Sequence, residues 1–297
     1  MNKPIVECPY CKGNCYLKYS SLSHPDWKDM KNIDMYECLR CKSLTTYPMP
    51  SKEKLISCYR SYVKGFPERK SIAKDNSNQK LWYKKVLRLI DLDFVEGKRI
   101  ADVGAGEGLF TEELIKICKN CEINCFDFHG MPDSLKRINL GGNKLKWTKT
   151  DVSEKSWIQK EKYDFVICNA VMEHVENPLG LLNNLIDICK KEGIIYVLAP
   201  CLNSWSYRVF GKRWVYIIPG EHLTIPSPKG LEYIRKIYPE HRFLIKKINP
   251  SYSTKYIIDS IFRTNIPKFL DFSISVPTGS FLMKIKKAST KNYNEKS

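Results

Sequence analysis

The sequence predicts an α/β protein with a doubly wound, largely parallel sheet and a small cysteine-rich ribbon at its N-terminus. Three observations carry this prediction. From Lys98 onward, short apolar runs alternate with helical stretches, a glycine-rich loop follows the first of these runs, and two C-x2-C pairs stand near the start of the chain. Together they separate a small metal-binding module from a larger ligand-binding sheet.

The strands of the predicted sheet are short apolar runs bounded by turn residues. We expect them at Arg99–Val103, Glu122–Phe128, Tyr163–Asn169 and Ile194–Ala199, with helices starting at Phe110 and Leu179. Beyond these, the pattern indicates a short helix from Ser227 and strands at Arg242–Lys246 and Ser280–Ile285. Such alternation is typical of a parallel sheet with helices on both faces.

The helix that starts near Leu179 has recognisable ends. Asn177 can cap its first turn, and Pro178 suits its first position because that residue needs no hydrogen-bonded N–H. Lys190, Lys191 and Gly193 are expected to close it.

Length, charge and cysteine content limit the class of protein. The 297 residues have room for one large domain and a small appendage. Met1 to Tyr10 lack an apolar export segment, and no apolar run approaches the ~18 residues of a membrane-spanning helix. We therefore expect a cytoplasmic protein whose twelve cysteines are reduced or bind metal. The net charge of +17 comes from dispersed lysines and leaves nucleic acid, anionic lipid and phosphorylated small molecules open as partners.

The two C-x2-C pairs predict a zinc site. Cys8 and Cys11 form one pair, and Cys38 and Cys41 form the other. Two thiolates on each tight turn complete a closed tetrahedral site, which has no open position for a substrate. The zinc is therefore expected to be structural, and Cys15 to be a spare thiol.

A glycine-rich loop over Ile100–Phe110 predicts a ligand site at the edge of the sheet. Gly104 and Gly106 allow a tight turn and close approach of a ligand to the backbone. A dinucleotide loop would have a third glycine where Leu109 stands, and Glu107 would repel a pyrophosphate from the helix start. A cofactor without phosphates is favoured.

Two acids follow where such a cofactor needs hydrogen-bond acceptors. Asp127 ends the second strand and can accept hydrogen bonds from ribose hydroxyls. Asp151 can accept from an exocyclic adenine amine while Val152 packs on the ring. Either acid alone is better explained as a solvated loop residue or a helix cap, but their order and spacing after the glycine loop favour the cofactor.

These motifs resemble those of class I S-adenosylmethionine-dependent methyltransferases, of the kind called methyltransferase domain family 23. The resemblance is carried by Asp102-x-Gly104-x-Gly106-x-Gly108, Asp127, Asp151, Asn169-Ala-Val-Met-Glu173-His174-Val and Ile194–Pro200. It implies a Rossmann-like fold and S-adenosylmethionine as cofactor. The residues that it assigns to the cofactor are Asp102, Gly104, Ala105, Gly106, Asp127, Asp151, Val152 and Asn169.

The N-terminal part resembles a zinc-ribbon-bearing branch often associated with glycan and sugar modification. This second resemblance is carried by Tyr36-Glu-Cys38-Leu-Arg-Cys41, Pro48-Met-Pro50 and Tyr59-x-x-Tyr62. It implies methylation at oxygen or carbon of a sugar or glycan-biosynthesis intermediate. The sequence departs from quinone-precursor O-methyltransferases, because Ala170 replaces the first acid of their E-x-x-E-H metal motif.

The resemblance also divides the chain. We expect a zinc ribbon over residues 1–50, a helical connector over 51–95 and a methyltransferase domain over 96–297. Substrate contacts are expected in the irregular, aromatic part at about 201–280. There, Trp205, Tyr207, Trp214 and Tyr216 can wall a cleft, although aromatic residues more often serve packing.

Methyl transfer to a hydroxyl or a carbon acid requires a base, and a histidine suits that role. Pro219-Gly-Glu221-His222 resembles a family segment in which a histidine faces the substrate, so we predict His222 as the base. Glu221 and His174 are further candidates, and a capping or packing role is the alternative for His174. The other histidines are interpreted as structural or exposed: His24, His129 and His241.

Two other functions stay open. One is an RNA methyltransferase that grips phosphates with the ribbon and basic residues, for which the dispersed charge makes nucleic acid a less favoured partner. The other is a non-catalytic ribbon protein, against which the intact loop and acids argue. The basic, aromatic stretch from Lys255 to Phe272 can contact an anionic membrane and reach a lipid-linked acceptor, but packing on the core is favoured because Pro267 interrupts any helix.

Overall fold

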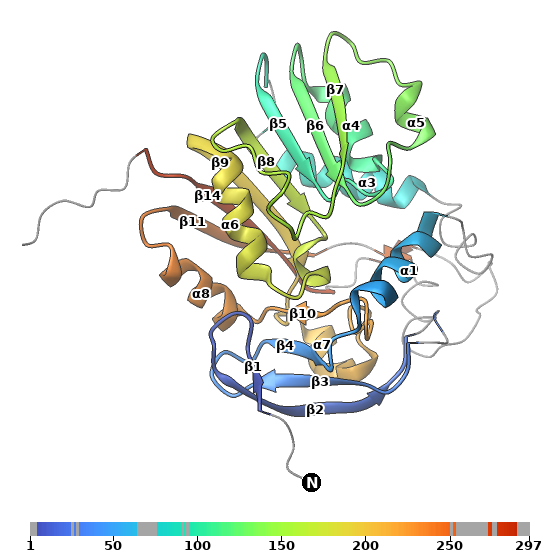
Figure 1. Cartoon of the computed structure of the whole chain (residues 1–297), viewed down its shortest axis with the longest axis vertical. Coiled ribbons are helices and arrows are strands. Elements are labelled where there is room, and N and C mark those ends of the chain that lie inside the picture. The colour runs from blue at the N-terminus through green and yellow to red at the C-terminus, as the bar shows by residue number, and fades with distance from the viewer. Residues whose placement is uncertain are drawn as a thin grey trace, which may run out of the picture.

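A seven-stranded sheet forms the centre of the larger part of the molecule, which follows the N-terminal ribbon (Figure 1). The computed structural model describes residues 5–24, 27, 30–63, 76–90, 92, 95–249, 252–253, 273–274 and 278–289. The strands of this sheet are β5 (Arg99–Val103), β6 (Glu122–Asp127), β7 (Lys144–Lys149), β8 (Tyr163–Asn169), β9 (Cys189–Pro200), β11 (Arg242–Ile248) and β14 (Ser280–Lys286).

The order of the strands is β11-β14-β9-β8-β5-β6-β7. The five strands from β9 to β7 run parallel, and β14 and β11 add an antiparallel edge. The chain runs outward from β5 through β6 to β7 and then returns to β8 on the other side of β5. Ligands of open α/β sheets bind at the carboxyl edge beside such a reversal.

Helices cover both faces of the sheet, which confirms the predicted doubly wound fold. The helices are α1 (Lys52–Val63), α3 (Asn76–Leu89), α4 (Leu109–Ile117), α5 (Asp133–Lys136), α6 (Pro178–Ile188), α7 (Trp205–Phe210) and α8 (Pro228–Ile237), with 3-10 turns η1 (Met172–His174) and η2 (Gly211–Arg213). Ile100, Ile123 and Ile167 pack with α3 and α4, whereas Val103 and Val166 pack with α6 on the other face. Side chains alternate in this way because successive residues of a strand point to opposite faces.

One end of α6 differs from the sequence-based expectation. Asn177 caps α6 as predicted, accepting from the backbone N–H of Gly180. However, α6 ends at Ile188, and Lys190 lies in β9 with its ammonium 2.9 Å from the carboxylate of Asp164. The prediction that the lysines close the helix was wrong because the chain enters the next strand directly.

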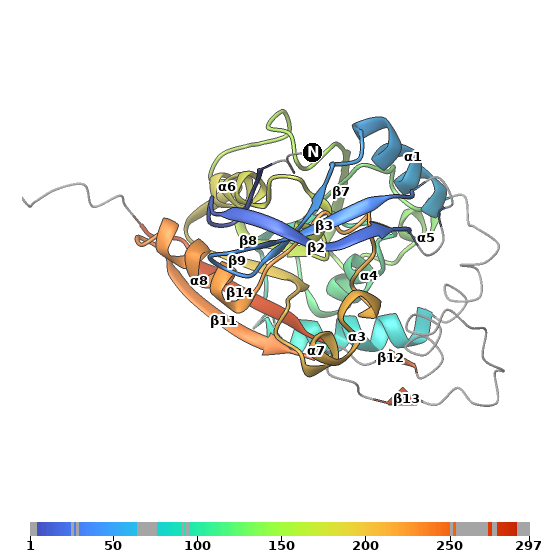
Figure 2. The ribbon, with the colours of Figure 1, turned by 90° about the horizontal axis from the view of Figure 1, so that it is seen from below.

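The N-terminal residues form a second sheet, with strands β1 (Val6–Glu7), β2 (Asn14–Leu22), β3 (Ile33–Cys38) and β4 (Leu44–Tyr47). Its fifth strand, β10 (Thr224–Ile225), comes from the part of the chain that follows β9 of the seven-stranded sheet, and it pairs with β4. Figure 2 shows β2 and β3 crossing in front of the molecule on this side. The ribbon and the segment around β10 therefore form one structural unit.

Two further findings concern the remaining described residues. A two-stranded ladder pairs β12 (Tyr252–Ser253) with β13 (Ser273–Ile274). None of the helices in the described part of the chain is long and apolar enough to cross a membrane. The stretch from Lys255 to Phe272, for which membrane contact was considered, lies outside the described residues.

Candidate active site

The glycine loop lies at the carboxyl edge of the sheet, where the strand order reverses. Gly104 has a φ of 77°, and a Cβ atom there would lie 2.2 Å from Cγ2 of Val171. Because Val171 follows β8, only glycine lets the two central strand ends approach this closely. The backbone N–H groups of Gly104 and Ala105 donate to the carbonyl of Phe126, which fixes the loop on β6.

Asp127 ends β6 beneath this loop. Its Oδ2 accepts from the N–H of Gly106 at 2.8 Å, and its Oδ1 accepts from the N–H of His129 at 2.8 Å. A carboxylate has about four acceptor positions, so it can still accept from ribose hydroxyls. The structure thus places Asp127 beside the loop, and no atom fills the space where a Cβ of Gly106 would stand.

Asp102 lies deeper than the other predicted cofactor residues. It is 2% exposed and accepts a hydrogen bond from the hydroxyl of Thr111 at 2.6 Å. Burial raises the pKa of Asp102 to about 7, and the nearby Asp127 adds to this effect. Its contacts tie β5 to α4, so its place in the fold is that of a support for the loop.

Asp151 and Val152 follow β7 on the same edge. Oδ1 of Asp151 accepts from the hydroxyl and N–H of Ser153, and the ammonium of Lys52 lies 3.2 Å from its Oδ2. Burial alone would raise the pKa of Asp151, but these partners outweigh burial and lower it. Helix α1 therefore reaches the acid that we predicted to accept from adenine. Val152 packs at the border of the core.

Asn169 ends β8 beside the glycine loop, as the pairing of Cys168 with Val103 requires. The chain then turns through Ala170, whose φ is 55°, into η1. This short turn carries Glu173 and His174 to the same edge of the sheet. The pairing of β5 with β8 therefore brings His174, one of the candidate bases, close to the predicted cofactor residues.

His222 meets His174 at this edge. The two rings have centroids 4.8 Å apart in an edge-to-face arrangement. Nδ1 of His222 lies 2.8 Å from the carbonyl oxygen of Tyr216, so this nitrogen donates its proton and Nε2 carries the lone pair. Burial, together with His174, lowers the pKa of His222 to about 3, so the ring is neutral at physiological pH.

Glu173 was not among the predicted catalytic residues, although it lies in the motif that carries the resemblance. It is 2% exposed, and burial raises its pKa. Its Oε2 has no hydrogen-bond partner among the described residues. One ligand atom each from Glu173, His174 and His222 lies within 4.8 Å of the others, a spacing that a metal ion can bridge.

Glu221 is held differently from the two histidines. It is 6% exposed, and its Oε2 lies 2.9 Å from Nε2 of His24 in the ribbon. Its backbone carbonyl accepts from Nδ1 of His174 at 3.1 Å. The carboxylate therefore points toward the ribbon, and the backbone toward the candidate base.

Two of the four aromatic residues proposed to wall a cleft pack inside the molecule. Trp214 is 1% and Tyr216 9% exposed, and the indole N–H of Trp214 donates to the carbonyl of Thr278 at 2.7 Å. Trp205, at 50%, is exposed. Two of the four thus belong to the core because the chain folds them under the ribbon.

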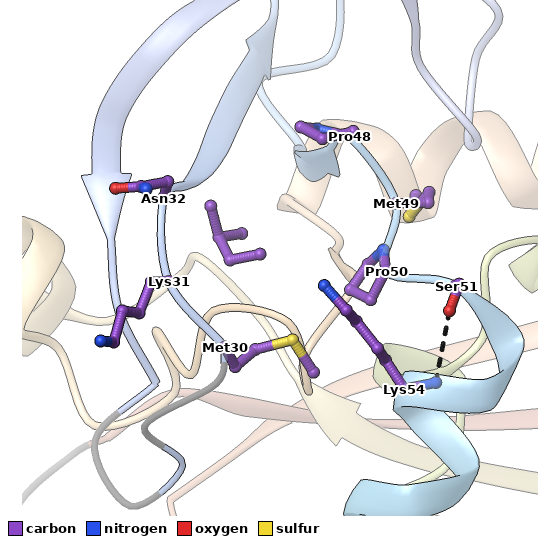
Figure 3. Close-up of a pocket in the computed structure, with 9 residues that line it drawn as sticks. Met30, Lys31, Asn32, Pro48, Met49, Pro50, Ser51 and Lys54 are labelled. Carbon is purple, nitrogen blue, oxygen red and sulfur yellow. Dashed lines mark hydrogen bonds between the residues drawn. The ribbon is translucent and has the colours of Figure 1, made fainter.

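A pocket of about 170 Å³ lies between the β2–β3 connection and the start of α1 (Figure 3). Met30, Ile33 and Met49 contribute apolar walls, and the side chain of Lys54 points into the space. Within the described part of the chain, Lys54 has no carboxylate partner. The pocket can hold a small group with an apolar part and a negative charge.

The four predicted zinc ligands converge in the ribbon. The sulfur atoms of Cys8 and Cys41 are 3.5 Å apart, those of Cys11 and Cys38 are 3.4 Å apart, and all four lie within 4.8 Å of one another. Zinc–sulfur bonds of about 2.3 Å place tetrahedral thiolates about 3.8 Å apart. The donors therefore fit zinc. Cys15 is not part of this group.

The two cysteine turns have the same backbone geometry. In each, the residue after the second cysteine has a positive φ, 58° for Lys12 and 66° for Lys42. The N–H of each lysine donates to the carbonyl of the first cysteine at 3.0 Å. This repeated turn aims both thiols of a pair at one point, as a zinc knuckle requires.

The sheet order, the glycine loop at the reversal and the acids after β6 and β7 define a Rossmann-like fold of the class I methyltransferase type. A family model described as a methyltransferase domain matches residues 75–235. The chain belongs to this methyltransferase domain family, whose members are enzymes.

Curated relatives and solved structures agree with this assignment. This chain is 28% identical to a ubiquinone biosynthesis O-methyltransferase of Dechloromonas aromatica over 146 residues. The matched region covers 48% of this chain and 60% of that protein. A protein of the same description from Aliivibrio fischeri is 27% identical over 136 residues, covering 45% and 55%. The chain thus spans 60% or less of the length of these relatives.

Among solved structures, a Burkholderia thailandensis 1,6-didemethyltoxoflavin-N1-methyltransferase with bound S-adenosylhomocysteine has a TM-score of 0.50 at 11% identity, covering 86% of this chain and 96% of that one. The YcgJ protein from Bacillus subtilis has a TM-score of 0.51 at 10% identity, covering 70% and 99%. At these identities the likeness concerns the fold.

Proposed function

We propose that the protein transfers the methyl group of S-adenosylmethionine to a hydroxyl oxygen of a small-molecule acceptor, with His222 as the base. The observation that carries this proposal is the neutral imidazole of His222, whose Nε2 lone pair is set by the bond from Nδ1 to Tyr216. The ring lies with His174 at the sheet edge that carries the glycine loop.

The chemistry suits a weak base. As the oxygen–methyl bond forms and the sulfonium–methyl bond breaks, the acceptor hydroxyl becomes strongly acidic, so even an imidazole with a depressed pKa can take its proton. S-adenosylhomocysteine then leaves with the electron pair of the broken bond. Since His222 is 6% exposed and His174 is more exposed, the acceptor is proposed to approach from the His174 side.

Glu173 can stabilise the charge that develops on the base. Its carboxylate lies within the 4.8 Å cluster with both histidines, and its Oε2 has no partner among the described residues. A buried carboxylate beside an imidazolium lowers the free energy of the protonated ring. We assign this electrostatic role to Glu173.

The acceptor is proposed as a sugar or a phenol-like small molecule with a negative charge. The sugar comes from the ribbon resemblance, and oxygen methylation agrees with the names of the curated relatives. The net charge of +17 favours a phosphorylated or carboxylated acceptor. The ribbon is proposed to bind one structural zinc.

The test uses S-adenosylmethionine labelled in its methyl group and a fractionated cell extract. The extract is separated into nucleotide-sugar, lipid-linked, phenolic, RNA and protein pools before counting. We expect label in a small-molecule pool, bound to oxygen, so that mild hydroiodic acid treatment releases it as methyl iodide while N-methyl and C-methyl groups stay in place. Label confined to RNA would reject the proposal in favour of an RNA methyltransferase, and no label in any pool would favour a non-catalytic protein.

A further inference from the structure

A buried hydrogen bond joins the ribbon to the candidate catalytic segment around Glu221. Nε2 of His24 lies 2.9 Å from Oε2 of Glu221, although the two residues are 197 positions apart in the sequence. Their side chains are 2% and 8% exposed. A hydrogen-bonded contact so well shielded from water holds its two segments in a defined relative position.

The orientation of the His24 ring is set on the ribbon side. Its Nδ1 accepts a hydrogen bond from the backbone N–H of Trp27 at 3.0 Å, so the proton toward Glu221 lies on Nε2. The backbone N–H of His24 also donates to the carbonyl of Met30 at 2.8 Å. The ring therefore has one donor direction, and it points to the Glu221 carboxylate.

The backbone of Glu221 passes this restraint to the candidate bases. Its carbonyl accepts from Nδ1 of His174 at 3.1 Å, which selects the tautomer of that ring. The N–H groups of Glu221 and His222 both donate to the carbonyl of Ile218, at 3.1 and 2.9 Å. A shift of Glu221 would consequently move both histidines.

The ribbon also contacts the turn at Glu221 and His222, here called the catalytic turn, at two more points. Met30 packs so closely on Gly220 that a Cβ atom on Gly220 would lie 2.4 Å from Cγ of Met30. On the other side, the N–H of Thr46 donates to the carbonyl of Leu223 at 2.7 Å, and its hydroxyl donates to the carbonyl of His222 at 3.3 Å. The catalytic turn is thus bounded by ribbon residues before and after Glu221.

We propose that His24 is a positioning residue for methyl transfer, so that the ribbon forms the support of the catalytic histidines. His24 fixes the carboxylate of Glu221, and the backbone of Glu221 fixes the ring of His174 beside His222. The inference rests on the proposed function in assigning the acceptor to this histidine pair. The cofactor loop, by contrast, is bonded to β6 and has no part in this chain of contacts.

Two substitutions separate the two nitrogens of His24. Asparagine can replace the Nδ1 acceptor for Trp27 but cannot reach Glu221, whereas glutamine places an amide donor near the position of Nε2. We therefore compare His24→Asn with His24→Gln. His241→Asn is the matched control, because His241 is also buried, with 7% of its side chain exposed, but packs on Tyr238 away from this segment.

The direct readout is the ring of His174 in histidine-selective nuclear magnetic resonance. In the wild type we expect a single tautomer protonated at Nδ1, with slow exchange of that proton. His24→Asn should lose this signature and lower methyl transfer by about 10- to 100-fold, since small displacements of reacting groups have effects of this size. His24→Gln and His241→Asn should keep the single His174 tautomer, and their methyl transfer should stay within about threefold of the wild type.

Zinc content and calorimetry with S-adenosylhomocysteine show whether the variants are folded. We expect each variant to keep the wild-type zinc content and to bind S-adenosylhomocysteine within about twofold of wild type. An unchanged His174 signal in His24→Asn would overturn the proposal, as would equal losses of methyl transfer in His24→Asn and His241→Asn. If the wild type labels no oxygen acceptor, the proposed function fails, but the His174 signal still decides the role of His24.

Discussion

The glycine loop and the turn at Glu221 and His222, the proposed sites of cofactor binding and catalysis, lie at the same edge of the sheet but are supported in different ways. The loop at Gly104 and Gly106 is bonded to the neighbouring strand β6, through Phe126 and Asp127. The turn at Glu221 is held by His24 from the ribbon. The first support comes from the repeated order of a βαβ unit, and the second from a contact between distant parts of the chain.

Cofactor binding and proton removal should therefore be sensitive to mutations in different parts of the chain. Damage to the ribbon should impair the histidines before it impairs cofactor binding, and damage to the loop should do the reverse. The ribbon and the main sheet are not fully independent, because Cys8, Tyr10 and Cys38 of the ribbon pack in the same hydrophobic cluster as residues of α6. Four experiments test this separation, in order of decreasing expected effect.

Removal of a ribbon thiol is expected to have the largest effect. Cys8→Ser should lose the single zinc ion and unfold the ribbon, because structural zinc contributes on the order of 10 kcal/mol to the folding of such modules. Metal analysis of protein purified without added zinc measures this. Cys15→Ser is the control and should keep its zinc, since Cys15 is outside the four-sulfur group. A folded wild-type preparation without metal would contradict the zinc assignment.

His222→Ala should lower methyl transfer by about 10²- to 10⁴-fold, the range for loss of a general base. Affinity for S-adenosylhomocysteine should stay within about twofold, because His222 makes its contacts in the turn and not in the loop. The labelled-extract assay and calorimetry measure the two quantities. Activity that survives in His222→Ala would keep the enzyme class and remove His222 as the base.

Asp102 should make stability depend on pH. Burial raises the pKa of Asp102 to about 7 in the folded protein, from 3.8. The folded state therefore keeps a proton that the unfolded chain releases. The free energy of unfolding consequently falls by up to about 4 kcal/mol as pH rises from about 4 to about 7, and it is level above about pH 7.

Asp102→Asn should remove this part of the pH dependence, because the amide does not ionise in that range. Urea denaturation at pH 5 and pH 8 measures it as the difference between the wild type and the variant. An equal change in stability for both proteins between these pH values would show that Asp102 does not titrate in the window.

Asp127→Ala should weaken binding of S-adenosylmethionine by about 100-fold, close to 3 kcal/mol, through loss of charged hydrogen bonds. Asp127→Asn should weaken it less, since the amide oxygen still accepts. Zinc content should be unchanged in both variants because Asp127 lies in the core sheet. Binding of NADH without binding of S-adenosylmethionine would contradict the cofactor assignment.

Some features could not be predicted from apolar runs. Strand β7 was missed because it is an edge strand in which three of the six residues are lysines, so that Leu145 and Trp147 do not form an apolar run. The ribbon strands were missed because residues 1–50 show little periodicity, yet four strands form there and a fifth comes from the part of the chain that follows β9. Sheet edges and small ribbons depend on pairing partners that local patterns do not specify.

The roles of the histidines show the same limit at the level of the site. His24 was interpreted as structural or exposed, because nothing in its neighbourhood indicates Glu221 as a partner. Trp214 and Tyr216 were considered as cleft walls, but they are buried. The only available signal was the chemistry of Glu221, an acid in an otherwise apolar turn, which needs a buried partner.

The parallel sheet, the glycine loop at its edge, the acids that follow two strands and the paired thiols can all be predicted from local patterns in the sequence. Each of these depends on short-range order, since strand, turn and helix follow one another along the chain. Three other features depend on long-range packing: β10 completes the ribbon sheet, His24 holds Glu221, and Glu173 lies beside the two histidines. These contacts join residues up to 197 positions apart, and they form because the packing of the whole chain, not local propensity, brings such residues together.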